Sequence, residues 1–194
     1  HALQGLIGGP IGDLNGHANA WECGSRVAYG SCSLIEYGDP YDIMGSYNHF
    51  HFNSMGKHHF GWFNDNQVIE VTSSGVFEIG PIETNSPEPK VLKIPKRYNY
   101  NTCELFEWYY VEYRMPIGFD RDPHNWLEYY GINNGAWIHY SPNLLLRSGS
   151  RVLDMTPQSL QSLEDFYDGA LAVGQTYTDE NNGITIRPLE LTAN

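Results

Sequence analysis

The residues of this chain best suited to metal chemistry lie in its first third. His17 lies upstream of a tight bend, Asp42-Ile43-Met44-Gly45-Ser46, and Met44 stands within that bend just before two small residues. Imidazole is the commonest side-chain ligand for zinc. A thioether beneath such a turn predicts an apolar floor next to a metal, although Met also fills irregular gaps in ordinary cores.

A second group of histidines follows the bend and offers an alternative metal site. Its members are His49, His51, His58 and His59. On a helix His51 and His58 would share a face, whereas His58 and His59 would point apart. Packing is therefore the expected role of this group. Asp39 precedes the bend, where it can either form the turn or hydrogen-bond a ligand histidine.

The elements that must position these residues are mostly short strands. Runs of β-branched and aromatic residues, bounded by Gly, Pro, Asn and Ser, predict strands at 68–71, 76–79, 91–94, 106–114, 136–140, 151–155, 171–173 and 183–186. Strands at this spacing favour an antiparallel sandwich or a small barrel. We therefore divide the chain into residues 1–65, which carry the histidines and the bend, and a β-rich region at 66–194.

Six blocks of the sequence occur in the order of one known family. They are His17-Ala18 followed by the run YGDPYDIMGS around Met44, Phe52-Asn53 with HFGW at 59–62, the run YYVEYRMPIGFD at 109–120, LDMTP at 153–157, AVGQ at 172–175, and GITI at 183–186. Together they resemble the gametolysin-like metzincins, a family of zinc metallopeptidases. The resemblance covers the chain from about His17 to about Ile186.

The resemblance implies a fold, a cofactor and an activity. The fold class would be α+β, with residues 1–65 the C-terminal part of a metzincin catalytic domain and residues 66–194 an antiparallel β-sandwich-like domain. His17 would be the third zinc ligand and Met44 the methionine of the Met-turn. Tyr47 would stabilise the oxyanion, although its spacing differs by one residue from the family pattern. The implied reaction is zinc-dependent hydrolysis of peptide bonds in secreted or cell-wall proteins and glycoproteins.

The family motif H-E-x-x-H is not found upstream of His17. Ile7, Gly8 and Ile11 stand where its first His, its Glu and its second His would fall. Residues 5–16 are rich in glycine and contain Pro10, and each of these residues costs a helix about 1 kcal/mol or more. We therefore expect no zinc-binding helix here, and the general-base Glu is unidentified.

Three explanations of the missing motif stay open. The sequence can begin near or inside the catalytic domain, as its lack of an initiator Met suggests. The chain can be an inactive homologue that serves as a structural module or binds glycans or proteins through its aromatic strands. Finally, zinc can be held by different residues.

Composition and cysteine spacing bound the partners and the compartment. The chain has 194 residues and a formal net charge of −12, from 23 acidic and 11 basic residues, which argues against a nucleic-acid partner. No apolar run approaches the roughly 18 residues of a membrane span. Cys23 and Cys32 can close a small disulfide loop or stay reduced, and Cys103 is left over. A disulfide would fit a secreted protein.

Overall fold

The computed structural model describes seven stretches of the chain. They are residues 19–22, 33–45, 50–99, 104–121, 130–141, 149–160 and 162–192. Within them the fold is mixed α+β and consists mostly of strands, with a single α-helix. This confirms the predicted α+β class.

The centre of the fold is a group of three long strands, β4 (Val91–Asn99), β5 (Glu104–Tyr113) and β6 (Gly135–Ser141). They pair antiparallel, β4 with β5 and β5 with β6. Shorter strands extend the sheet on both sides: β3 (Val68–Glu70), β7 (Arg151–Leu153), β1 (Asn19–Glu22) and β2 (Ser33–Ile35). The order is β2-β1-β7-β6-β5-β4-β3, and β8 (Leu171–Ala172) also pairs with β6.

Two of the pairings, β1 with β7 and β3 with β4, are parallel, and the other described pairings are antiparallel. β1 and β2 come from the region before residue 66 but join the same sheet as β3 to β8. The sheet thus crosses the boundary predicted between residues 65 and 66, and that boundary stays a prediction.

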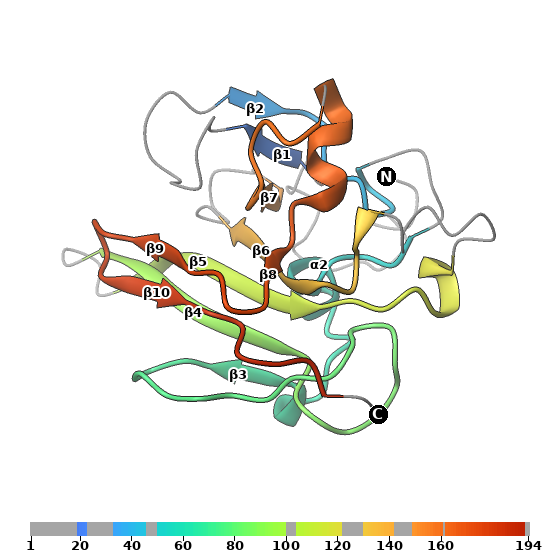
Figure 1. Ribbon diagram of the computed structural model, residues 1–194. Coiled ribbons are helices and arrows are strands. Elements are labelled where there is room, and N and C mark those ends of the chain that lie inside the picture. The colour runs from blue at the N-terminus through green and yellow to red at the C-terminus, as the bar shows by residue number, and fades with distance from the viewer. Residues whose placement is uncertain are drawn as a thin grey trace.

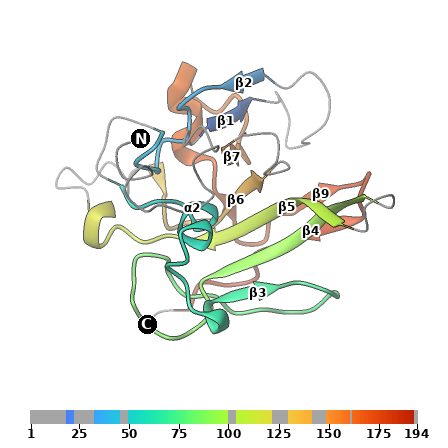
Figure 2. The same cartoon turned by 180° about the vertical axis from the view of Figure 1, so that it is seen from behind.

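Different elements cover the two faces of the sheet. The hairpin of β9 (Tyr177–Asp179) and β10 (Ile184–Ile186) lies in front of β4 and β5 in Figure 1, whereas helix α2 (Ser54–His59) lies behind them. Seen from behind, α2 is in front and the hairpin is behind (Figure 2). Three 3-10 segments, Asp65–Gln67, Gly118–Asp120 and Ser162–Asp168, complete the described helical elements.

Alternation along β5 gives the two faces different chemistry. Tyr109 and Val111 point into an apolar core under the hairpin, together with Ile138, Tyr140, Leu153, Met155, Leu171, Tyr177 and Ile186. Since successive side chains of a strand point to opposite faces, Tyr110 and Glu112 point to the face of α2. Tyr110 packs there against Met55 and Val91. A buried carboxylate is therefore aimed at the side of the sheet on which the Met44 turn packs.

The predicted strands mostly form, with three differences. Val76–Ile79 is not a strand: no described strand pairs with it, and Val76 is 82% exposed. The pairs β1–β2 and β9–β10 include strands that the sequence pattern did not indicate, because β1, β2 and β9 are only three or four residues long. Among the described helices, none is long and apolar enough to cross a membrane.

Candidate functional site

Of the residues predicted for the metal site, the structure describes Met44. His17 and Tyr47 lie outside the described residues, as do the predicted disulfide partners Cys23 and Cys32. The roles assigned to these four residues therefore stay predictions. Residues 39–45 around Met44 are described, however, and so are several of the groups that hold them, which can be built up from the backbone.

The Met44 turn, residues 39–45, is organised by two aspartates that accept hydrogen bonds from the backbone. The Tyr41 N–H donates to Asp39 Oδ1 at 3.1 Å, and the Met44 N–H donates to Asp42 Oδ1 at 2.7 Å. The Gly45 N–H closes the bend on the Asp42 carbonyl at 2.9 Å. Asp and Asn form such local bonds readily, which explains why the segment leaves the strand geometry of its neighbours.

The second oxygen of Asp42 ties the turn to helix α2. Asp42 Oδ2 accepts the Asn53 N–H at 2.6 Å, and Asn53 is the N-cap of α2, where its Oδ1 accepts the Gly56 N–H at 3.0 Å. The Asn53 amide also donates to Ser150 Oγ at 2.6 Å. One buried carboxylate thus fixes Met44 relative to the first turn of the helix.

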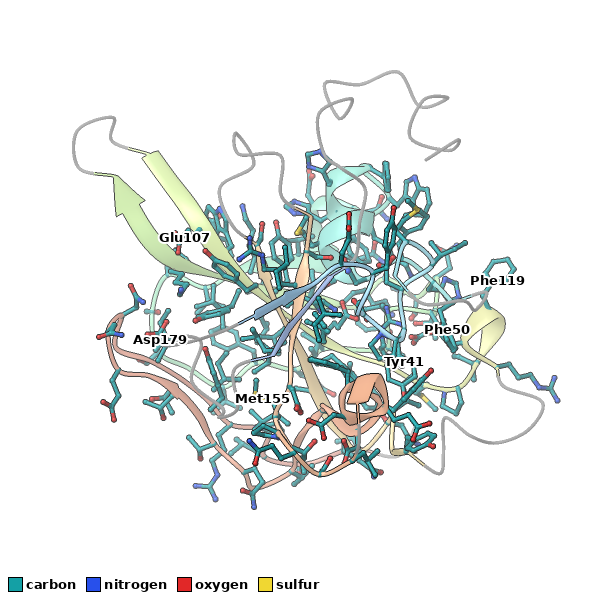
Figure 3. The ribbon with its side chains drawn as sticks, turned by 90° about the horizontal axis from the view of Figure 1, so that it is seen from above. Tyr41, Phe50, Glu107, Phe119, Met155 and Asp179 are labelled. Atoms are coloured by element: carbon teal, nitrogen blue, oxygen red, sulfur yellow. The ribbon has the colours of Figure 1, made fainter. Side chains whose placement is uncertain are left out.

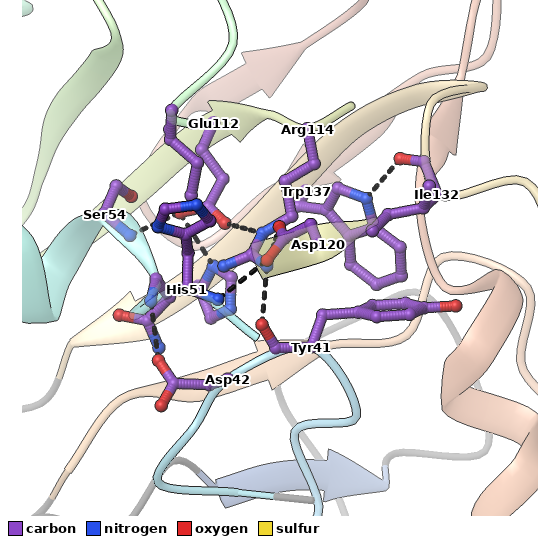
Figure 4. Close-up of polar contacts among 12 residues, drawn as sticks. Tyr41, Asp42, His51, Ser54, Glu112, Arg114, Asp120, Ile132 and Trp137 are labelled. Carbon is purple, nitrogen blue, oxygen red and sulfur yellow. Dashed lines mark hydrogen bonds and ion pairs between the residues drawn. The ribbon is translucent and has the colours of Figure 1, made fainter. Parts of the chain in front are cut away.

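Glu112 of β5 and Arg114, which directly follows the strand, form an ion pair that is fully buried. Arg114 Nε donates to Glu112 Oε1 at 2.6 Å, and Glu112 Oε2 accepts the Ser54 N–H at 2.5 Å. Arg114 Nη1 donates to the carbonyl of Tyr41 at 2.5 Å and to Asp120 Oδ2 at 3.0 Å. Figure 4 shows Arg114 between Glu112, Asp120 and the backbone of Tyr41. A single guanidinium therefore joins the strand, the 118–120 segment and the Met44 turn.

Asp120 extends this buried network to the segment that follows the Met44 turn. Its Oδ1 accepts the His51 N–H at 2.7 Å (Figure 4). The neighbouring Phe119 is 70% exposed and projects from the edge of the molecule in Figure 3. Glu83 accepts the Met115 N–H at 3.2 Å through Oε2, and its carboxyl faces Asp120.

The charges in this network shift one another's proton affinity. Burial favours the neutral form of Glu112, but the charges of Arg114 and His139 outweigh it and hold its pKa at about 2. Burial, reinforced by the charge of Asp39, raises the pKa of Asp42 to about 7. Burial and the adjacent Asp120 carboxylate raise the pKa of Glu83 to about 9, against the attraction of Arg114. Asp42 therefore titrates near neutral pH, whereas the partly buried carboxyl of Glu83 stays protonated there.

The second histidine group is not assembled into a metal site in the part of the chain that is described. His58 Nδ1 lies 3.0 Å from the Tyr110 hydroxyl, whereas the ring of His51 packs edge-on against Phe119. Burial lowers the pKa of His51 to about 4. Across the described residues no three His, Cys, Asp or Glu side chains are placed to hold a metal ion together. The expected packing role of His51 and His58 agrees with these contacts.

Sequence reasoning missed Glu112, Arg114, Asp120 and His139 as supports of the Met44 turn. Glu112 and Arg114 alternate with Val111 and Tyr113, a pattern that ordinarily places charges on a solvated face. The signal that could have found them is their mixed sign within two residues, because buried charges occur in pairs. Asp39 was considered as a turn former, and it also contacts His139, 100 residues away.

The described atoms can position a site but do not themselves constitute a reaction centre. Glu112, Arg114 and Asp120 each have an exposed fraction of at most 1%, and their hydrogen bonds are made to one another and to backbone groups; among the described residues Arg114 Nη2 has no hydrogen-bond partner. Comparison of the chain with protein-family models, with curated proteins and with solved structures gave no match.

Proposed function

We propose that this chain is a gametolysin-like metzincin, a secreted zinc endopeptidase, or a part of one. In this proposal the Met44 turn is the floor of the zinc site, and the strands after residue 65 form a sandwich-like region behind it. The observation that carries the proposal is that Asp42 accepts hydrogen bonds from two separate segments. They come from the Met44 N–H at 2.7 Å and from the Asn53 N–H at 2.6 Å.

The argument rests on what a floor beneath a metal site requires. A site that orients its ligands must be held within about 0.5 Å by groups that are themselves fixed. Asp42 is 2% exposed and fixes Met44 to the N-terminus of α2, while Arg114 fixes the carbonyl of Tyr41 to β5. The residues that carry the resemblance at 37–46 and at 109–120 are therefore bonded to each other, as parts of one site would be.

The described residues do not by themselves fit a zinc ion, since they contain no set of three ligands. In the proposal His17 is one ligand, and the others are unidentified. Zinc bound there would activate water for attack on a peptide bond. The described residues have a positioning role instead: Asp42, Arg114 and Glu112 hold the turn in place. Tyr47 as oxyanion stabiliser and a Cys23–Cys32 disulfide belong to the same proposal, as do extracellular or cell-wall protein and glycoprotein substrates.

A second candidate function is a module that keeps this scaffold without catalysis and binds a glycan or a protein. One observation favours it: Trp62 is 50% exposed and stacks on Phe60, with ring centroids 5.2 Å apart and an angle of 29°. Among the aromatic residues of the strands, Tyr109 and Tyr110 do not suit this role, because they are buried.

Metal analysis of the whole gene product, including whatever residues precede His1, tests the first candidate. We expect about one zinc per chain and chelator-sensitive cleavage of a protein substrate. His17→Ala is expected to lower both, whereas the matched variant His58→Ala changes neither. Absence of both zinc and chelator-sensitive cleavage overturns the endopeptidase proposal. Retention on an immobilised glycoprotein that Trp62→Ala abolishes would then support the binding module.

A further inference from the structure

His139 is a buried histidine whose place in the sheet is fixed from both sides. It lies on β6, where it is opposite Tyr110 of β5 and Val152 of β7, and it is 2% exposed. Alternation along β6 directs it to the same face as Trp137, which packs edge-on against Tyr41 at 4.9 Å. Its ring is therefore held directly beneath the Met44 turn.

The two ring nitrogens of His139 meet two different carboxylates. Nε2 lies 2.9 Å from Asp39 Oδ2, and Nδ1 lies 3.8 Å from Glu112 Oε2. Within the described residues Nδ1 has no hydrogen-bond partner. A neutral imidazole carries one N–H and one lone pair. If Nε2 donates to Asp39, the neutral ring would turn its lone pair toward the ionised Glu112, which is unfavourable; a proton on Nδ1 removes this repulsion.

Asp39 and Asp42 explain why the turn needs such a cation. They are 1% and 2% exposed and lie within one bend, so that their charges repel in a medium of low dielectric. Asp39 receives hydrogen bonds from the Tyr41 N–H at 3.1 Å and from the Asn53 amide at 3.4 Å, both of which are neutral donors. Among the residues that the structure describes, the ionisable donor that contacts Asp39 is His139.

We propose that protonated His139 is a positioning residue for the Met44 turn, holding Asp39 against β5 and β6 and so setting where Met44 lies. The charges that act on its ring are Glu112 of β5 and Asp39 of the turn, which favour the imidazolium, and Arg114, which disfavours it. Its neighbour on β7 is the apolar Val152. Burial alone would lower the pKa of His139, but Glu112 and Asp39 outweigh burial and raise it.

The role of Met44 as the floor of a zinc site rests on the proposed function, but the positioning itself does not. The test therefore uses no zinc and no substrate. Hydrogen peroxide oxidises accessible methionines, and mass spectrometry compares the rate at Met44 with that at Met155, which is 1% exposed in the core. We expect this ratio to rise between pH 6 and pH 9, by at most about tenfold for each pH unit by which the pKa of His139 exceeds its ordinary value, because Met44 is already partly exposed in the fold.

The variant His139→Gln keeps a neutral donor near Asp39 and removes the charge. In this variant the ratio of the Met44 to the Met155 oxidation rate is expected to be high already at pH 6 and to rise no further up to pH 9. His58→Gln, on helix α2, is the matched control and should follow the wild type. If His139→Gln fails to fold, as fast oxidation of Met155 would reveal, Asp39→Asn takes its place. That variant should abolish the pH step and lower the pKa of His139, measured by NMR of the ring nitrogens.

Two results would overturn the positioning role. One is a neutral His139 at pH 6 in the NMR titration, and the other is a Met44 ratio that is the same at pH 6 and pH 9 in the wild type. Either result leaves the endopeptidase proposal standing. Conversely, a protein that holds no zinc can still show the pH step, so that the failures of the two proposals are distinguishable.

Discussion

Arg114 Nη1 donates a 2.5 Å hydrogen bond to the backbone carbonyl of Tyr41, which lies 73 residues earlier in the chain. The same guanidinium pairs with Glu112 and Asp120, and all three side chains are at most 1% exposed. Removing one partner of a buried pair leaves the others charged and desolvated. The Met44 turn is thus attached to a cation that directly follows the distant strand β5.

Replacing Arg114 by Met is therefore expected to destabilise the protein by about 3–5 kcal/mol, because Glu112 and Asp120 lose their counter-charge. Arg114→Lys should cost less, since it keeps the charge and loses only the forked geometry. Urea unfolding measures both. The control is Lys93→Met, which breaks the partly exposed pair with Glu70 and should cost less than about 1 kcal/mol. Equal losses for the Arg114 and Lys93 variants would contradict the attachment.

Stability is expected to fall as the pH rises from 6.5 to 8; below that range the lowered pKa values of His51, His58 and His59 oppose the fall. The carboxyl of Glu83 has a pKa of 4.5 when unfolded and about 9 in the fold. Between these values the folded state binds more protons than the unfolded state, so the free energy of unfolding decreases with pH. Asp42, raised to about 7, acts in the same direction up to that pH. Lys57, whose pKa is lowered by burial and by Arg114 to about 8, opposes the trend only above pH 8.

Glu83→Gln isolates the share of Glu83 in this trend. The amide oxygen of Gln can accept the Met115 N–H, and its NH2 can donate to Asp120 without a titrating proton. At pH 8 the melting temperature of the variant should exceed that of the wild type by about 2–4 °C for each kcal/mol of repulsion removed. At pH 5 the two should agree. Calorimetry between pH 5 and pH 8 measures both melting temperatures. If their difference does not change with pH, Glu83 does not titrate in this range.

A chain of hydroxyl groups attaches the β9–β10 hairpin to the other face of the sheet. Tyr177 Oη donates to Tyr109 Oη at 2.8 Å, and Tyr109 Oη donates to Asp179 Oδ2 at 2.8 Å. Tyr109→Phe removes both bonds and should cost about 1–3 kcal/mol, whereas Tyr177→Phe removes one and should cost about 1 kcal/mol. Urea unfolding compares the loss of stability in the two variants. A larger loss for Tyr177→Phe would contradict the donor–acceptor order of these hydroxyl groups.

The long strands of this fold could be predicted from sequence, whereas the support of the Met44 turn could not. β5 and β6 alternate aromatic and β-branched residues over enough positions to be recognised, and both formed as predicted. The strand predicted at 76–79 did not form. The prediction was wrong because an apolar pattern does not show whether a neighbouring strand has a free edge to pair with. Asp39 and His139 meet across 100 residues. Such a contact follows from sheet register, which local periodicity does not determine.

The last prediction compares two contributions to the stability of the Met44 turn: the hydrogen bonds of its backbone to Asp42 and the packing of the Met44 side chain. Asp42→Ala removes the acceptor of the Met44 and Asn53 N–H groups, and each buried donor left unpaired costs about 1–3 kcal/mol. Met44→Leu leaves the backbone bonds intact and should cost less than about 1.5 kcal/mol, as exchanges of similar volume do. Urea unfolding compares the two variants. If Met44→Leu were the more damaging, Met44 itself would hold the turn, and the anchoring assigned to Asp42 would be wrong.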